Sequence, residues 1–226
     1  MIRLPIGDYV ERGIDWLTVN LAPFFTGIKE GLSGIINGFD FIFNGIPFFI
    51  TIAILAVIAW RLAGRGTAIF TVIGLLLIVS MNLWKQTMET LALVVTATLI
   101  ALLLGLPLGI WMSRSDKANG TIRPILDFMQ TMPAFVYLIP AVYFFDLGEV
   151  PGAVATVIFA MPPVVRLTSL GIRQVPVDVV EASKAFGATS GQLLWKVQIP
   201  MAMPTILAGL NPVSYTHLTL PTIYSV

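Results

Sequence analysis

The side chains able to catalyse a reaction or hold a metal ion are few in this sequence. Its 226 residues include one histidine, His217, and no cysteine. Disulfides, thiolate metal sites and cysteine nucleophiles are therefore excluded, and the sequence lacks a G-x-x-x-x-G-K-[ST] phosphate-binding loop. The net charge of +1 gives no reason to propose a nucleic-acid partner. We expect neither catalysis nor a metal or cofactor bound by this chain.

One carboxylate, Asp127, lies inside an apolar stretch, PILDFMQTMPAFVYLIPAVYFF at 124–145. Ionisable groups inside membrane-spanning segments are usually functional. Asp127 is, however, close to one end of the stretch and only a few residues from Arg123. We therefore favour an interfacial residue paired with this basic neighbour.

Residues 174–200 indicate another kind of chemistry, the recognition of a second protein. Pro176 and Asp178 predict the start of a helix. Gly187 predicts the end of that helix, as the residue that follows the C-cap. Between these signals, four residues repeat at helical spacing: Glu181, Ala182, Ala185 and Phe186.

A second short helix is predicted directly after the first. Thr189 and Gln192 have the spacing of a capping box, which places the helix at about 192–197. Pro200 and Pro204 follow, and we expect them to stop this helix, since proline removes a backbone donor and clashes with the preceding turn.

The first predicted helix has a face that another protein's backbone can approach closely. Small side chains lie on it, at Ala182, Ser183 and Ala185, while Glu181 and Lys184 place charge at its rim. Two short helices joined at a glycine and anchored by membrane spans would form a rigid projection for transmitting force. The alternative is an ordinary capped helix pair in a loop.

The elements that must position this projection are membrane spans. The chain is 57% hydrophobic and 11% charged, with a mean hydropathy of +0.89, whereas soluble domains carry about 25% charged residues. Residues 1–40 are expected to form an amphipathic leader at the outer membrane face, and the alternative is a solvated leader of no particular role. Apolar stretches near the roughly 20 residues that a bilayer requires predict an all-α bundle with five spans, at 41–60, 67–84, 90–112, 124–145 and 152–172.

The distribution of basic residues predicts the orientation of these spans. When the loops after residue 60 are assigned alternately to the two sides, one side receives nine Lys or Arg residues and the other receives only Lys85. The basic side is expected to be cytoplasmic, so the N-terminus would lie outside. The nine are Arg61, Arg65, Arg114, Lys117, Arg123, Arg166, Arg173, Lys184 and Lys196.

The stretch EASKAFGATSGQLLWKVQIP, at 181–200, resembles the EAA signature of ABC importer permeases. The match rests on Glu181, Ala182, Gly187 and the pair Ile199–Pro200. The chain departs from the pattern at Ser183, which replaces the second alanine, and where isoleucine rather than leucine precedes the proline. Both replacements stay close to the pattern in size and polarity.

A longer stretch, from about Arg114 to Asn211, resembles the permeases of glycine betaine and proline betaine (quaternary ammonium) importers. The resemblance implies a type I importer fold for a transmembrane domain at 41–211, in which residues 174–200, the coupling segment, sit in a groove of a separate ATPase subunit. It assigns the contact with that subunit to Glu181, Ala182, Ser183, Ala185, Phe186, Gly187, Ile199 and Pro200.

The same resemblance implies the partners and the location. ATP and Mg²⁺ would be bound by a dimer of ATPase subunits, so this chain would be a permease and not an enzyme. We further expect a second permease subunit, giving a homodimer, an extracytoplasmic substrate-binding protein, and a multi-pass position in a bacterial inner membrane.

The resemblance assigns no substrate-binding residue. Aromatic side chains would suit cation–π recognition of a quaternary ammonium group, but an aromatic belt at the outer end of a span is the favoured interpretation. Alternative functions are an importer of another small polar solute, or a scaffold or channel with no ATPase. A channel would be expected to show filter elements within its spans. The aromatic residues concerned are Phe135, Tyr137, Tyr143, Phe144 and Phe145.

Residues 212–226 do not fit the rest of the chain. The family pattern would continue into two further apolar spans after Asn211, whereas VSYTHLTLPT, at 213–222, matches one translated frame of a transposase-type sequencing adapter. We therefore expect 212–226 to be non-native and the permease domain to be truncated, and the alternative is a natural truncated variant. His217 receives no role.

Overall fold

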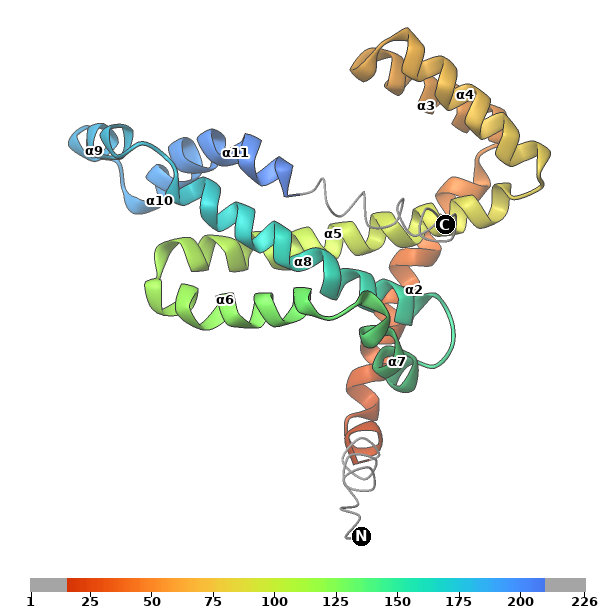
Figure 1. The fold of residues 1–226 in the computed structure, drawn as a ribbon, viewed down its shortest axis with the longest axis horizontal. Coiled ribbons are helices and arrows are strands. Elements are labelled where there is room, and N and C mark those ends of the chain that lie inside the picture. Colours follow the sequence, from red (N-terminus) through yellow and green to blue (C-terminus); the bar gives the residue numbers. More distant parts are fainter. Residues whose placement is uncertain (1–15, 210–226) are drawn as a thin grey trace. The chain divides into compact units, whose positions relative to one another are not determined.

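The computed structural model describes residues 16–209, and all of their regular secondary structure is helical. The helices run from α2 to α11 in chain order (Figure 1). The first 15 residues of the expected amphipathic leader and the whole of the unusual tail, with His217, lie outside the described residues.

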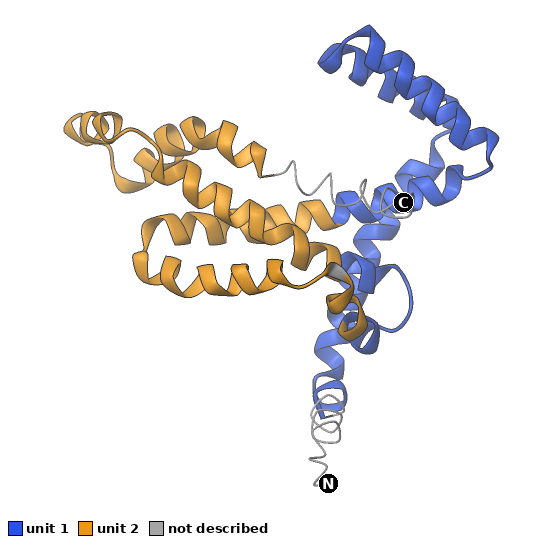
Figure 2. Ribbon diagram, in the orientation of Figure 1, with its two compact units in different colours: residues 1–96, 141–153 blue, residues 97–140, 154–226 orange. Residues whose placement is uncertain are grey.

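The chain divides into two compact units (Figure 2). Unit 1 contains the described residues of Met1–Thr96 and Ala141–Ala153. Unit 2 contains those of Ala97–Pro140 and Val154–Val226, and therefore the whole coupling segment. Each unit is described by itself below.

Unit 1 begins with α2, Ala22–Gly45, and α3, Phe48–Ala63, which meet at a bend of 98°. The expected first span at 41–60 is therefore wrong as one straight helix, and the boundary at residue 40 falls inside α2. The cause is Pro47. A residue before proline is pushed out of the α region, and Ile46 accordingly has φ −88° and ψ 131°.

The α3 helix packs against α4, Arg65–Ser80, after a turn at Gly64 with φ +91°. Figure 1 shows the two helices side by side. The expected second span at 67–84 is shorter than predicted, since α4 ends at Ser80 and Asn82 adopts φ +58°. At 16 residues, α4 is shorter than a bilayer span requires.

The expected third and fifth spans are confirmed as continuous apolar helices. They are α5, Trp84–Arg114, and α8, Glu149–Arg173, each long and apolar enough to cross a membrane. The expected fourth span is divided into α6, Asp116–Thr131, and α7, Ala134–Phe145, with a bend of 97°. Among the described residues, the pair α2 and α3 and the pair α6 and α7 are long and apolar enough to cross a membrane only if each bent pair is counted as one span.

The core of unit 2 is built around α8. Val165, which is fully buried, packs with Met112 of α5 and Leu126 of α6. Further along α8, Ile172 packs with Ala202 of α11, Ile199–Ala208. Figure 1 shows α5, α6 and α8 lying along one another, with α9, Val177–Ala185, and α10, Ser190–Leu193, beyond the end of α8. The coupling segment therefore extends from a packed frame of helices.

Candidate functional site

The first helix of the coupling segment is α9, Val177–Ala185. Pro176 occupies the N-cap position without a capping hydrogen bond from its side chain. Asp178 lies in the first turn, where the helix dipole favours a carboxylate. The predicted helix start is confirmed to within one residue.

The end of α9 is a Schellman motif centred on Gly187. The Gly187 N–H donates to the Lys184 carbonyl at 2.9 Å, and the Ala188 N–H donates to the Ser183 carbonyl at 3.0 Å. These are the two hydrogen bonds that define the motif. Gly187 has φ +83°, so the prediction that it ends the helix is confirmed.

The second helix begins with the predicted capping box. The Thr189 hydroxyl accepts from the Gln192 N–H at 3.3 Å, and the Gln192 side-chain oxygen accepts from the Thr189 N–H at 2.9 Å. The helix α10, Ser190–Leu193, follows, and the chain then continues through a π-helical turn, Leu194–Gln198.

The prediction that prolines stop this helix is wrong. The chain passes from the π-turn into α11, Ile199–Ala208, which has Pro200 in its first turn and Pro204 in its interior. In the π-turn the Ile199 N–H donates to the Leu194 carbonyl, five residues back. In a regular α-helix the ring of Pro200 would clash with the carbonyl four residues earlier. The wider π-helical turn changes the distance between backbone groups at this point.

The residues expected to contact an ATPase differ in exposure. Glu181, Ala182, Ala185 and Gly187 are exposed, and Phe186 is 93% exposed. A single exposed apolar residue is common at protein surfaces, so Phe186 is informative only together with the exposed small residues of α9 beside it. The exposed small face of α9 and the phenylalanine beside it could thus receive a protein partner.

Two of the expected contact residues also make contacts within the fold. The Ser183 hydroxyl donates to the Val179 carbonyl at 2.7 Å, within α9. Ile199 is partly buried and packs against the cluster around Ile172 and Ala202. Pro200 is exposed at the start of α11.

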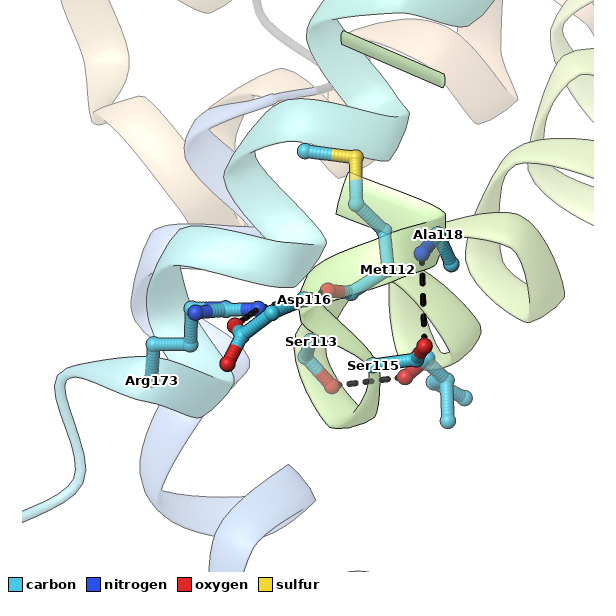
Figure 3. Close-up of polar contacts among 7 residues, drawn as sticks. Met112, Ser113, Ser115, Asp116, Ala118 and Arg173 are labelled. Carbon is cyan, nitrogen blue, oxygen red and sulfur yellow. Dashed lines mark hydrogen bonds and ion pairs between the residues drawn. The ribbon is translucent and has the colours of Figure 1, made fainter. Parts of the chain in front are cut away.

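Two arginines that the sequence suggested only as markers of orientation hold the coupling segment in place. Arg173, the last residue of α8, donates to the Met112 carbonyl and to the Asp116 carboxylate, both at 2.9 Å (Figure 3). Arg114, the last residue of α5, donates to the Ser190 carbonyl at 2.8 Å. The only signal in the sequence was their position at predicted helix ends.

Asp127 pairs with Arg166 of α8 and not with its neighbour Arg123. The expected pairing is therefore wrong, because the packing of α6 against α8 brings together residues 39 positions apart in the sequence. The pair joins two helices of unit 2.

Four of the five aromatic residues considered for substrate binding contact another ring or the backbone, whereas Phe135 is 60% exposed. In unit 1, Phe144 stacks on Phe25 with ring centroids 4.6 Å apart, and Phe145 meets the same ring edge-on at 5.7 Å. In unit 2, the Tyr137 hydroxyl donates to the Met129 carbonyl at 2.9 Å. These contacts favour a packing role for Tyr137, Phe144 and Phe145.

An apolar groove of about 450 Å³ lies between α5 and α11 in unit 2. Its lining is apolar apart from Thr168 and the indole of Trp195. Since no charged side chain lines this groove, it offers no ionic partner to a charged solute.

Comparison with known proteins places this sequence in a family. Residues 101–214 match the family described as binding-protein-dependent transport system inner membrane component. The match covers the C-terminal part of α5, the coupling segment and α11.

Three curated relatives are similar over nearly the whole chain. The chain is 50% identical to the glycine betaine transport system permease protein OpuAB of Bacillus subtilis (strain 168) over 209 residues, which are 92% of this chain and 74% of the relative. It is 48% identical to the glycine betaine/proline betaine permease protein ProW of Escherichia coli (strain K12) over 222 residues, 98% of this chain and 63% of the relative.

The third relative is the glycine betaine/carnitine transport permease protein GbuB of Listeria monocytogenes serotype 1/2a (strain 10403S), 49% identical over 92% of this chain and 75% of the relative. The chain thus spans about two thirds to three quarters of the length of these proteins. The family match and these identities extend across the coupling segment and the helices that hold it. The chain belongs to the binding-protein-dependent transport system inner membrane components, the permeases of ABC importers.

Proposed function

We propose that this chain is the membrane permease subunit of an ATP-driven importer of glycine betaine or a related methylated amine, and that its coupling segment docks on an ATPase subunit. The observation that carries the proposal is the exposed small face of α9 with Phe186 beside it. The Schellman motif and the capping box hold this surface in a defined shape, as a surface that transmits force requires.

The substrate class is supported by the names of the relatives. Glycine betaine, proline betaine and carnitine occur in the names of proteins about half identical to this chain. More distant relatives, 30–39% identical, are named for trimethylamine N-oxide, carnitine and choline. All of these solutes carry a methylated nitrogen, so we assign a methylated amine as the cargo and glycine betaine as the first candidate.

The assembly follows from the same proposal. Two copies of the permease would form the pathway, two ATPase subunits would bind ATP and Mg²⁺, and an extracytoplasmic binding protein would deliver the solute. The coupling segment would face the cytoplasm of a bacterial cell and the N-terminus would lie outside, as the excess of basic residues on one side indicates.

The docking proposal is tested by Phe186→Ala in the permease, with the affinity for the purified ATPase subunit as the measurement. We expect the dissociation constant to rise about tenfold or more, because aromatic residues at the centre of an interface contribute strongly to affinity. The matched control is Leu147→Ala, another exposed apolar residue at 87%, in the turn between α7 and α8. Equal affinities of both variants and the unaltered permease would contradict the docking site.

The cargo is tested separately by uptake of labelled glycine betaine into vesicles that contain the permease, the ATPase and the binding protein. We expect ATP-dependent uptake of glycine betaine. We also expect choline, carnitine or trimethylamine N-oxide to reduce this uptake by competition. ATPase binding without uptake of any methylated amine would leave the docking proposal standing and overturn the substrate class.

A further inference from the structure

One guanidinium group joins the coupling segment to the C-terminal end of α5, and another joins that end to the residue that immediately precedes the segment. Arg173 stands at the point where α8 leads into the coupling segment, and its Nη2 atom lies 2.9 Å from both the Met112 carbonyl and the Asp116 carboxylate. Arg114 reaches from α5 to the Ser190 carbonyl, at the start of α10. The end of α5 therefore contacts one residue that precedes α9, Arg173, and one that follows α9, Ser190.

Packing between α9 and the end of α5 is incomplete. A cleft of about 230 Å³ lies there, lined on one side by Ser113 and Arg114 and on the other by Val177 and Val180. Protein interiors are normally filled to crystal-like density and transmit displacement through contact. Leu106 and Ile110 of α5 pack against the cluster that contains Leu194 of the coupling segment. Near α9, where the cleft leaves the packing incomplete, the contacts of the two arginines add to this apolar link.

The two contacts of Arg173 differ in strength. The Asp116 side chain is 93% exposed, so water and salt screen the ion pair and its contribution is small. Met112 is buried, and its carbonyl is one of the last four of α5, which have no donor within the helix. A guanidinium that satisfies this carbonyl makes a charge-assisted hydrogen bond. The carbonyl contact is therefore the stronger of the two.

We propose that Arg173 and Arg114 are positioning residues that make the end of α5 follow the coupling segment, so that a displacement of α9 reaches a membrane span. The inference rests on the proposed function, because a docked ATPase supplies the displacement. Both arginines act through the backbone carbonyls of Met112 and Ser190, and their removal uncouples ATP hydrolysis from transport.

The test uses the full permease assembled with its ATPase and binding protein in proteoliposomes. Glycine betaine uptake and ATP hydrolysis are measured in the same vesicles, and their ratio is the readout. Arg173→Gln is expected to lower uptake per ATP hydrolysed several-fold, because the end of α5 then follows the coupling segment less closely. Arg173→Lys keeps the charge and is expected to restore most of the ratio.

Two further variants separate this role from a general effect of charge. Asp116→Asn removes only the screened ion pair and is expected to change the ratio at most about twofold. Lys117→Gln removes an exposed positive charge from the same turn of α6, one that makes no ion pair in the described part of the chain, and should leave the ratio unchanged.

The outcomes distinguish this inference from the function on which it rests. An unchanged ratio in an assembled Arg173→Gln complex overturns the inference, and so does an equal fall in Lys117→Gln. If Arg173→Gln does not assemble, Arg114→Gln is measured in the same way, and an unchanged ratio there overturns it. An unaltered complex that shows no ATP-dependent uptake overturns the proposed function instead.

Discussion

Gly187 holds the junction of α9 and α10 in a backbone conformation that other residues adopt only at a cost. Its φ is +83°, and a Cβ atom added there would meet nothing within 4 Å. The cost of a side chain at this position is therefore conformational, not steric. It is about 1–2 kcal/mol for a non-glycine residue in the left-handed region.

Gly187→Ala is accordingly expected to destabilise the junction by about 1–2 kcal/mol. Hydrogen exchange of the Ala188 and Leu193 amides measures this change. The Ala188 N–H donates to the Ser183 carbonyl across the junction, and the Leu193 N–H donates to the Thr189 carbonyl at the N-cap of α10. The control is Gly191→Ala inside α10, where alanine should stabilise the helix by up to about 1 kcal/mol. Faster exchange in Gly191→Ala than in Gly187→Ala would contradict this account.

At the residue scale, the sequence predicted local contacts and missed distant ones. The capping box joins Thr189 and Gln192, three positions apart, so its spacing is visible in the sequence. Arg114 and Ser190 are 76 positions apart, and no local pattern relates them. Asp127 was given the wrong partner for the same reason, since packing and not proximity in sequence selects Arg166.

At the scale of the helices, α5 and α8 cross at a close approach that depends on Gly109. A Cβ atom at this position would lie 2.6 Å from the Thr168 Cβ and 2.8 Å from the Val165 carbonyl oxygen. A carbonyl of the backbone cannot move aside as a flexible side chain can. The two helices would have to separate to accommodate even alanine.

Gly109→Ala is therefore expected to destabilise the protein by about 1–3 kcal/mol, the usual range for an overpacked contact. The midpoint of thermal unfolding in detergent should fall. Gly120→Ala in α6 is the control, because its Cβ would meet nothing within 4 Å and alanine is the better helix former. A midpoint for Gly109→Ala equal to that of Gly120→Ala would show that the helices do not approach this closely.

Proline explains why some helices were predicted well and others were not. Hydropathy identified α5 and α8, whose apolar residues form one long run. It could not show that Pro47 would end a helix while Pro162 and Pro163 lie inside α8. The difference depends on whether neighbouring structure satisfies the carbonyls that each proline frees, and a single sequence does not contain that information.

At the scale of the whole molecule, a docking surface is joined to a membrane span. The coupling segment presents α9 to a partner, and two arginines join it to α5. The all-helical fold and the family were predicted from composition and from the EAA-like stretch. The solute pathway was not, because no residue pattern within the spans identified it.

The central claim, that α9 contacts the ATPase, is tested most directly by site-specific cross-linking. The sequence contains no cysteine, so Ala185→Cys introduces a single thiol on the exposed face of α9. In membranes that contain the ATPase, a short thiol-reactive cross-linker should produce an adduct of the two subunits from Ala185→Cys and none from Leu147→Cys. An adduct from Leu147→Cys, with none from Ala185→Cys, would contradict the account.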